Sequence, residues 1–154
     1  SEAYGVTIRD NIIVDNHDDG IWIEGRGTVE PDTSIVGNTI LRNNEDGIYL
    51  SSGADISLIG ANTIKFHSRY GVHISSSSNI ELWDNEISSN TEYDLYFASS
   101  SSNNALNTLF DTISVDSQSH LTIQNYLSVS IFEVDNSSLS GVHVRILEEF
   151  CFAH

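Results

Sequence analysis

The stretch NEDGIYL (Asn44–Leu50) repeats a pattern that the chain has already used in HDDGIWI (His17–Ile23). In both stretches a glycine separates acidic residues from an apolar, aromatic, apolar triplet. The same frame recurs at steps of 27, 24 and 23 residues, at Gly20, Gly47, Gly71 and Asp94. A period of this length indicates a repeat architecture in which each unit stacks on the last.

Two further columns of polar residues keep the register of this frame. An asparagine stands nine residues before each frame position, at Asn11, Asn38, Asn62 and Asn85. A second column follows five residues later, at Asn16, Asn43, His67 and Asn90. Stacked asparagines can bond their amides to backbone and to one another, so we expect both columns to form structural ladders. We expect the three frame glycines to sit at a corner of positive φ, where Asp94 is a tolerable substitute.

Apolar residues alternate with period two inside each unit, which predicts three short strands separated by polar corners. The residues expected to fill the interior are Val6, Ile8, Ile13, Ile21, Ile23, Ile35, Ile40, Ile48, Leu50, Ile56, Leu58, Ile64, Val72, Ile74, Ile80, Leu82, Ile87, Leu95 and Phe97. We interpret Ala61 as a one-residue bulge. Three short strands in about 23 residues describe one coil of a parallel β-helix, in which neighbouring strands lie about 4.8 Å apart.

The chain is predicted to divide into three parts. Residues 1–125 form the β-helix repeats, and residues 126–147 read as a β-hairpin that resembles the start of an immunoglobulin-like sandwich. Residues 148–154 form a tail that contains the single cysteine, Cys151. We expect the hairpin to cover the open end of the stack, because an unpaired edge strand invites pairing with other chains. The repeat pattern is already under way at residue 6, so we expect this chain to be part of a longer protein. Other domains of that protein are then its expected partners.

The Asn-x-Ile motif with its downstream Asn and Gly-Ile-x-Leu resembles the repeat of right-handed parallel β-helix proteins. The resemblance covers about residues 6–115. Such proteins include pectin-degrading enzymes, alginate epimerases, a periplasmic protein associated with copper maturation of nitrous oxide reductase, and bacterial and archaeal surface proteins. The resemblance implies an all-β, right-handed parallel β-helix of about four to five coils, in an extracellular or cell-surface protein. It implies no single function, because the repeat serves enzymes, adhesins and spacers alike.

Charge narrows the range of partners. Six Lys and Arg against 22 Asp and Glu give a formal charge of −16. Nucleic acid is an unsuitable partner, since phosphate binding needs cationic side chains. The sequence also lacks an apolar run of about 18 residues, the length of a membrane span.

An aromatic column is the first candidate functional site. The middle residue of each triplet points outward, which gives the column Trp22, Tyr49, His73 and Tyr96. Rings at this spacing predict a flat carbohydrate-binding platform. The alternative is a ladder of rings that serves stability alone.

An acidic corner is the second candidate. Asp18 and Asp19 precede one frame glycine, and Glu45 and Asp46 precede the next. Carboxylates from two coils offer the oxygen ligands that Ca²⁺ prefers, so Ca²⁺ is the one cofactor that the pattern allows. The alternative is a solvated acidic edge that Arg69 partly neutralises.

No pair of carboxylates stands out as a general acid and base. His17 with Asp18 and Asp19, together with His73, comes nearest to a lyase or epimerase set. The sequence therefore favours a non-catalytic structural or carbohydrate-binding module of a larger protein. The alternative is part of a polysaccharide-active β-helix enzyme, either a lyase, an epimerase or a glycoside hydrolase.

Overall fold

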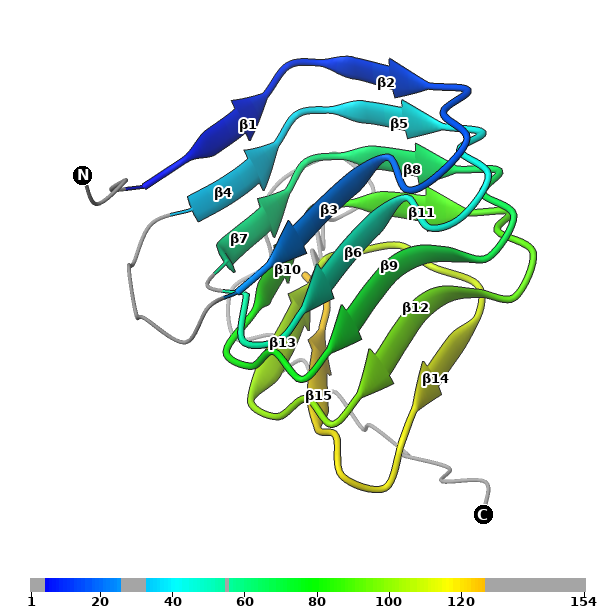
Figure 1. Ribbon diagram of the computed structural model, residues 1–154. Helices are drawn as coiled ribbons and strands as arrows, with labels where there is room; N and C mark the ends of the chain where they lie inside the picture. The colour runs from blue at the N-terminus through cyan, green and yellow to red at the C-terminus, as the bar shows by residue number, and fades with distance from the viewer. Residues whose placement is uncertain (1–4, 26–32, 55, 127–154) are drawn as a thin grey trace, which may run out of the picture.

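The computed structural model describes residues 5–25, 33–54 and 56–126. Every regular element among these residues is a β-strand, and the strands wind into a right-handed parallel β-helix of about four turns (Figure 1). The predicted fold class is confirmed. Apart from Tyr126, the predicted hairpin (residues 126–147) and the predicted tail (residues 148–154) lie outside the described residues.

Three parallel sheets form the walls of the helix, and each of the first four coils contributes one strand to each sheet (Figure 1). Sheet A contains β1 (Thr7–Arg9), β4 (Thr33–Val36), β7 (Ile56–Gly60), β10 (Glu81–Trp83), β13 (Asn103–Leu106) and β15 (Leu121–Gln124). Sheet B contains β2 (Ile12–Val14), β5 (Thr39–Leu41), β8 (Thr63–Lys65) and β11 (Glu86–Ser88). Sheet C contains β3 (Ile21–Glu24), β6 (Ile48–Ser51), β9 (Tyr70–Ser75), β12 (Tyr93–Ala98) and β14 (Ile113–Val115).

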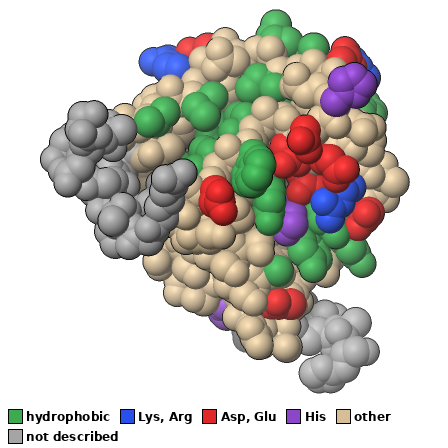
Figure 2. All heavy atoms as spheres, viewed as in Figure 1, with side chains coloured by type: hydrophobic (Ala, Val, Ile, Leu, Met, Phe, Trp, Pro, Cys, Tyr) green, Lys and Arg blue, Asp and Glu red, His purple; other side chains and the backbone are tan. Residues whose placement is uncertain are grey.

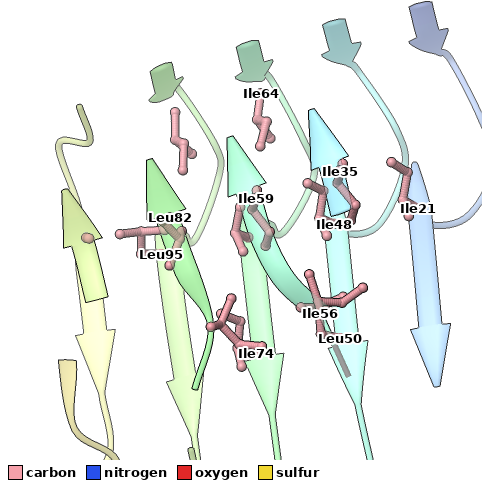
Figure 3. Packing of buried hydrophobic residues seen from close by; sticks show 14 of the residues in the cluster. Ile21, Ile35, Ile48, Leu50, Ile56, Ile59, Ile64, Ile74, Leu82 and Leu95 are labelled. Atoms are coloured by element: carbon pink, nitrogen blue, oxygen red, sulfur yellow. The ribbon is translucent and has the colours of Figure 1, made fainter. Parts of the chain in front are cut away.

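The interior is a set of aliphatic columns, one residue per coil (Figure 3). In sheet C, for example, the strand register places Ile21, Ile48, Val72, Leu95 and Ile113 in one column. Because side chains alternate across a strand, register alone decides which residues point inward. Each fully buried Ile or Leu contributes about 1.5–3 kcal/mol relative to an exposed one, so the columns supply most of the driving force.

Two predicted core positions are wrong. Val6, in the first coil, is 49% exposed. Leu58 points outward, and Ile59 is the residue that lies fully buried in the core. The cause is a bulge: Thr33 pairs with Ile56 but Ser34 pairs with Leu58, so the extra residue of this coil is Ser57 and not Ala61.

The first asparagine column forms a ladder of hydrogen bonds between coils. Asn38 donates both its backbone N–H and its Nδ2 to Asn62 Oδ1, at 2.9 and 3.0 Å. Asn62 repeats the pair to Asn85 Oδ1, at 3.0 Å for each bond. The second Nδ2 hydrogen of Asn62 bonds the Ile35 carbonyl at 2.9 Å. The ladder therefore satisfies buried backbone groups that no strand pairing reaches.

The second column continues the same pattern but changes at His67. Asn16 donates its backbone N–H and Nδ2 to Asn43 Oδ1 at 3.1 and 2.9 Å. Asn43 donates its backbone N–H to His67 Nδ1 at 3.1 Å, while Nε2 of His67 lies 3.1 Å from the Ile40 carbonyl. A ring nitrogen accepts one bond where an amide oxygen accepts two. As a result, Asn43 Nδ2 is buried without a partner among the described residues.

The frame glycines are required for a different reason from the one predicted. Among the described glycines, positive φ occurs at Gly5, Gly37 and Gly53 and not at the frame positions. A Cβ on Gly47 would instead lie 2.5 Å from the Gly71 carbonyl oxygen and 2.6 Å from Ile64 Cγ2. The coil passes too close to its neighbour for a side chain. Left-handed φ also occurs directly before the ladder positions, at Asp10, Asp15, Gly37, Arg42, Ala61, Phe66, Asp84 and Ser89.

Asp94 replaces the fourth frame glycine because its side chain ends the second ladder. Its Oδ1 accepts a hydrogen bond from Asn90 Nδ2 at 2.8 Å. Its Oδ2 accepts the backbone N–H groups of Asp111 and Thr112 at 2.9 and 3.1 Å. The carboxylate thus takes the place of the missing ladder side chain in the next coil.

Asn62→Ala tests the first ladder. The substitution leaves two donors of Asn38 and the Ile35 carbonyl without their partner in a buried corner. We expect the free energy of unfolding, measured in urea, to fall by about 3 kcal/mol or more. Asn11→Ala is the matched control, because Asn11 is an exposed member of the same column. Similar losses for the two variants would contradict the ladder's role.

His67→Asn tests the second ladder through its pH dependence. Burial lowers the pKa of His67 below its ordinary 6.5. The unfolded chain therefore takes up a proton at a higher pH than the folded chain, so the free energy of unfolding falls as the pH drops below 6.5. We expect His67→Asn to reduce this fall between about pH 7 and pH 5, measured in urea at each pH. The exposed His17→Asn is the control, and an equal change there would contradict the assignment.

Candidate functional site on sheet C

The predicted aromatic column lies on the outer face of sheet C. Trp22, Tyr49, His73 and Tyr96 occupy equivalent positions of β3, β6, β9 and β12. Exposure to solvent differs along this column. Trp22, in the first coil, is 60% exposed, whereas the His73 side chain, two coils further on, is 12% exposed. Figure 2 shows this face, with hydrophobic side chains beside a group of acidic ones.

The rings stack on one another instead of turning their faces to solvent. The centroids of Tyr49 and His73 are 4.4 Å apart with an interplanar angle of 25°. Trp22 stacks on Tyr49 at 6.3 Å and 19°. The column therefore presents ring edges, hydroxyl groups and the open side of Trp22, and not the flat platform expected from the spacing.

A second ring column runs beside the first. Tyr70 stacks on Tyr96 at 4.5 Å and 7°, and Tyr93 lies 6.3 Å from Tyr96. His73 meets the edges of both Tyr70 and Tyr96 at 5.0 Å. The six rings form one cluster, hereafter the ring cluster, made of Trp22, Tyr49, Tyr70, His73, Tyr93 and Tyr96.

A buried carboxylate fixes the central imidazole. Asp46 is 1% exposed, and its Oδ2 lies 2.8 Å from His73 Nδ1. Its Oδ1 accepts the backbone N–H of Tyr70 at 3.2 Å. The repeat pattern places Asp46 in the acidic corner and gives no sign of its contact with His73, since the two residues sit at different positions of the repeat. The pairing crosses from one coil to the next diagonally, which a column alignment does not show.

The acidic corner borders the ring cluster. Arg69 Nη1 lies 3.2 Å from a Glu45 carboxylate oxygen, and Arg69 Nε lies 3.9 Å from one of Glu92. Asp19 Oδ1 accepts the backbone N–H of Asp46 at 2.9 Å. Burial, together with the neighbouring carboxylates, raises the pKa of Asp19.

The predicted Ca²⁺ ligands do not converge. Both oxygens of Asp46 and one oxygen of Asp19 are committed to hydrogen bonds, and Glu45 pairs with Arg69. Within residues 5–25, 33–54 and 56–126, no group of three or more His, Cys, Asp or Glu side chains is arranged to hold a metal ion. Asp18 remains an exposed carboxylate at the edge of the corner.

Stacked parallel coils with side-chain ladders define the class of parallel β-helix proteins. Residues 1–138 match the family described as periplasmic copper-binding protein (NosD), and the chain belongs to that family. Comparisons with curated proteins and with solved structures give no significant match. The part of the chain that the structure describes contains no helix that could cross a membrane.

The described residues do not fit the copper ion that the family description implies. Both ring nitrogens of His67 are engaged by backbone groups, at 3.1 Å in each case. His73 Nδ1 is held by Asp46, and no third His, Cys, Asp or Glu joins them as a metal-holding group in the described segments. Cys151 lies outside the described residues. Among the described residues, the site on sheet C is a ring cluster.

Asp46→Ala tests the pairing with His73. The substitution removes the acceptor of the buried Tyr70 N–H and of the imidazole, so we expect a loss of about 2 kcal/mol in the free energy of unfolding. Asp18→Ala, at an exposed position of the same corner, should change it by less than about 0.5 kcal/mol. Thermal unfolding of the two variants measures the difference. An Asp46→Ala variant as stable as Asp18→Ala would show that the pair contributes nothing.

Proposed function

We propose that this chain is a non-catalytic carbohydrate-binding β-helix module of a larger exported protein. The carrying observation is that six rings gather at one outer face, where Trp22 is 60% exposed and Tyr93 is 39% exposed, although Tyr70 among them is buried. The family's periplasmic description supports export, and an extracellular or cell-surface position is part of the proposal.

Trp22 provides the main contact surface for a sugar. Tyr49 covers one side of its indole, and the exposed remainder offers a large apolar area of the kind that packs on the C–H face of a pyranose. The indole Nε1 lies within 3.5 Å of Ser51 Oγ, which fixes the ring orientation. The hydroxyl and imidazole edges farther along the column supply hydrogen-bonding groups for sugar hydroxyls.

The charge around the rings favours a neutral glycan. Asp18 and Glu92 are exposed beside the cluster, and Arg69 is already paired with Glu45 and Glu92. A polyuronate would bring its carboxylates against these side chains at a cost in like-charge repulsion. A neutral polysaccharide meets no such penalty.

Binding of the double variant Trp22→Ala, Tyr49→Ala tests the proposal. The protein is titrated with neutral and acidic polysaccharides, with and without Ca²⁺, by isothermal calorimetry. We expect binding of a neutral polymer to weaken about tenfold or more in the variant, because stacked ring area is lost. Ile12→Ala, an exposed apolar position on sheet B, is the control and should bind as the parent protein does. Unchanged binding in the double variant, or no binding by the parent, would leave the ring cluster as a stabilising stack.

The Asp46–His73 pair favours a second candidate function, catalysis on a polysaccharide. A carboxylate that holds one imidazole nitrogen orients the other nitrogen to take a proton, as a general base requires. Incubation with pectate, alginate and xylan, followed by assays for unsaturated products, new reducing ends and epimerised residues, tests this candidate. Turnover that is lost in His73→Ala would establish an enzyme. Absence of product from every polymer would reject it.

A further inference from the structure

The second tryptophan, Trp83, stands on the outer face of sheet A between two hollows. Its side chain is 46% exposed, and it ends strand β10. At the position equivalent to Trp83, the preceding coil has Gly60 and the following coil has Leu106. Neither neighbour is a ring, so neither stacks on the indole as Tyr49 stacks on Trp22.

Gly60 opens the hollow on one side of the indole. This space of about 180 Å³ is lined by Val36, Leu58, Gly60 and Trp83, with Asp84 at its border. Leu58 faces outward here because of the bulge at Ser57, so the bulge supplies an apolar wall for the hollow.

A larger groove of about 470 Å³ lies along the next coils and is also lined by Trp83. Its walls combine Trp83, Leu106 and Tyr126 with the polar side chains of Glu81, Asn104 and Gln124. The polar side chains occupy exposed positions of β10, β13 and β15. The volume falls within the range of about 300–1,000 Å³ that is typical of small-molecule sites.

We propose that sheet A carries a second carbohydrate-binding site, in which Trp83 stacks on a pyranose ring of a neutral saccharide. An indole bordered by open space accepts the C–H face of a sugar, while carboxylate and amide groups in one groove bond its hydroxyls. Glu81 and Asp84 give the site an acidic border, which disfavours uronate ligands. The inference shares its ligand class with the proposed function but rests on different residues, on a different face.

The two tryptophans allow the two faces to be tested separately, because the chain has only Trp22 and Trp83. In Trp22→Phe the fluorescence reports on sheet A, and in Trp83→Phe it reports on sheet C. Both full-length variants are titrated with cellohexaose, mannohexaose and maltohexaose. We expect at least one oligosaccharide to shift the Trp83 emission to shorter wavelength and to protect Trp83 from acrylamide quenching.

Gly60→Val provides a variant that blocks the hollow and keeps the indole. A Cβ at residue 60 would lie no closer than 3.4 Å to any neighbouring atom, and valine suits a strand. In the Trp22→Phe background, we expect Gly60→Val to weaken the titration about tenfold or more. An unchanged melting temperature in this variant would separate the loss of binding from a loss of folding.

Each outcome bears on one face. A response of Trp22 without a response of Trp83 would overturn the sheet A site and leave the proposed function in place. A response of Trp83 that Gly60→Val does not change would also overturn it, because the ligand would then not use the hollow. Trp83 emission that resists acrylamide before any sugar is added would show that protein already covers the indole, and would reject the site.

Discussion

The amide ladders between coils are the interaction on which the rest of this structure depends. A parallel strand pair fixes spacing, but the corners between sheets leave backbone groups that strand pairing cannot satisfy. Asn38 and Asn62 meet that need by donating two hydrogen bonds each to the side chain of the next coil. Because each bond links equivalent positions, the ladders hold every coil in register with the next. The aliphatic columns of the core and the side-chain columns of the surface both follow from this register.

The two outer faces differ in what their columns contain. On sheet C the repeat supplies a ring on each of four coils, so the rings cover one another and expose mainly their edges. On sheet A the repeat supplies one indole between a glycine and a leucine, and the indole lines two hollows. Regular repetition thus stacks the rings, and the interruption of a column leaves open space beside a ring.

The fold could be predicted from the sequence because its period and its asparagine columns are visible without coordinates. Positions that depend on a local shift in register could not be predicted. Leu58 follows the alternation expected of a core residue, and only the bulge at Ser57 moves Ile59 into its place. The glycine column was identified, but its cause is the close approach of Gly47 to the next coil and not its φ angle.

Four members of the ring cluster could be predicted for the same reason, whereas Tyr70, Tyr93 and the orientation of the rings could not. A column alignment shows that Trp22 and Tyr49 are neighbours but not that their rings lie nearly parallel. It also cannot show the diagonal contact between Asp46 and His73. Trp83 was missed because it has no aromatic partner in its column. The space beside Gly60 is a property of packing, and a repeat pattern contains no sign of it.

Hydrogen exchange at the ladder amides would test the central claim most directly. The backbone N–H groups of Asn38, Asn62 and Asn43 donate to side chains of the next coil at 2.9, 3.0 and 3.1 Å. If the ladders hold the coils together, these amides exchange only when the β-helix unfolds, at the rate of the slowest amides in β5 and β8. Exchange at the rate of exposed corner amides such as that of Asp18 would show that the corners open independently, and would contradict the account.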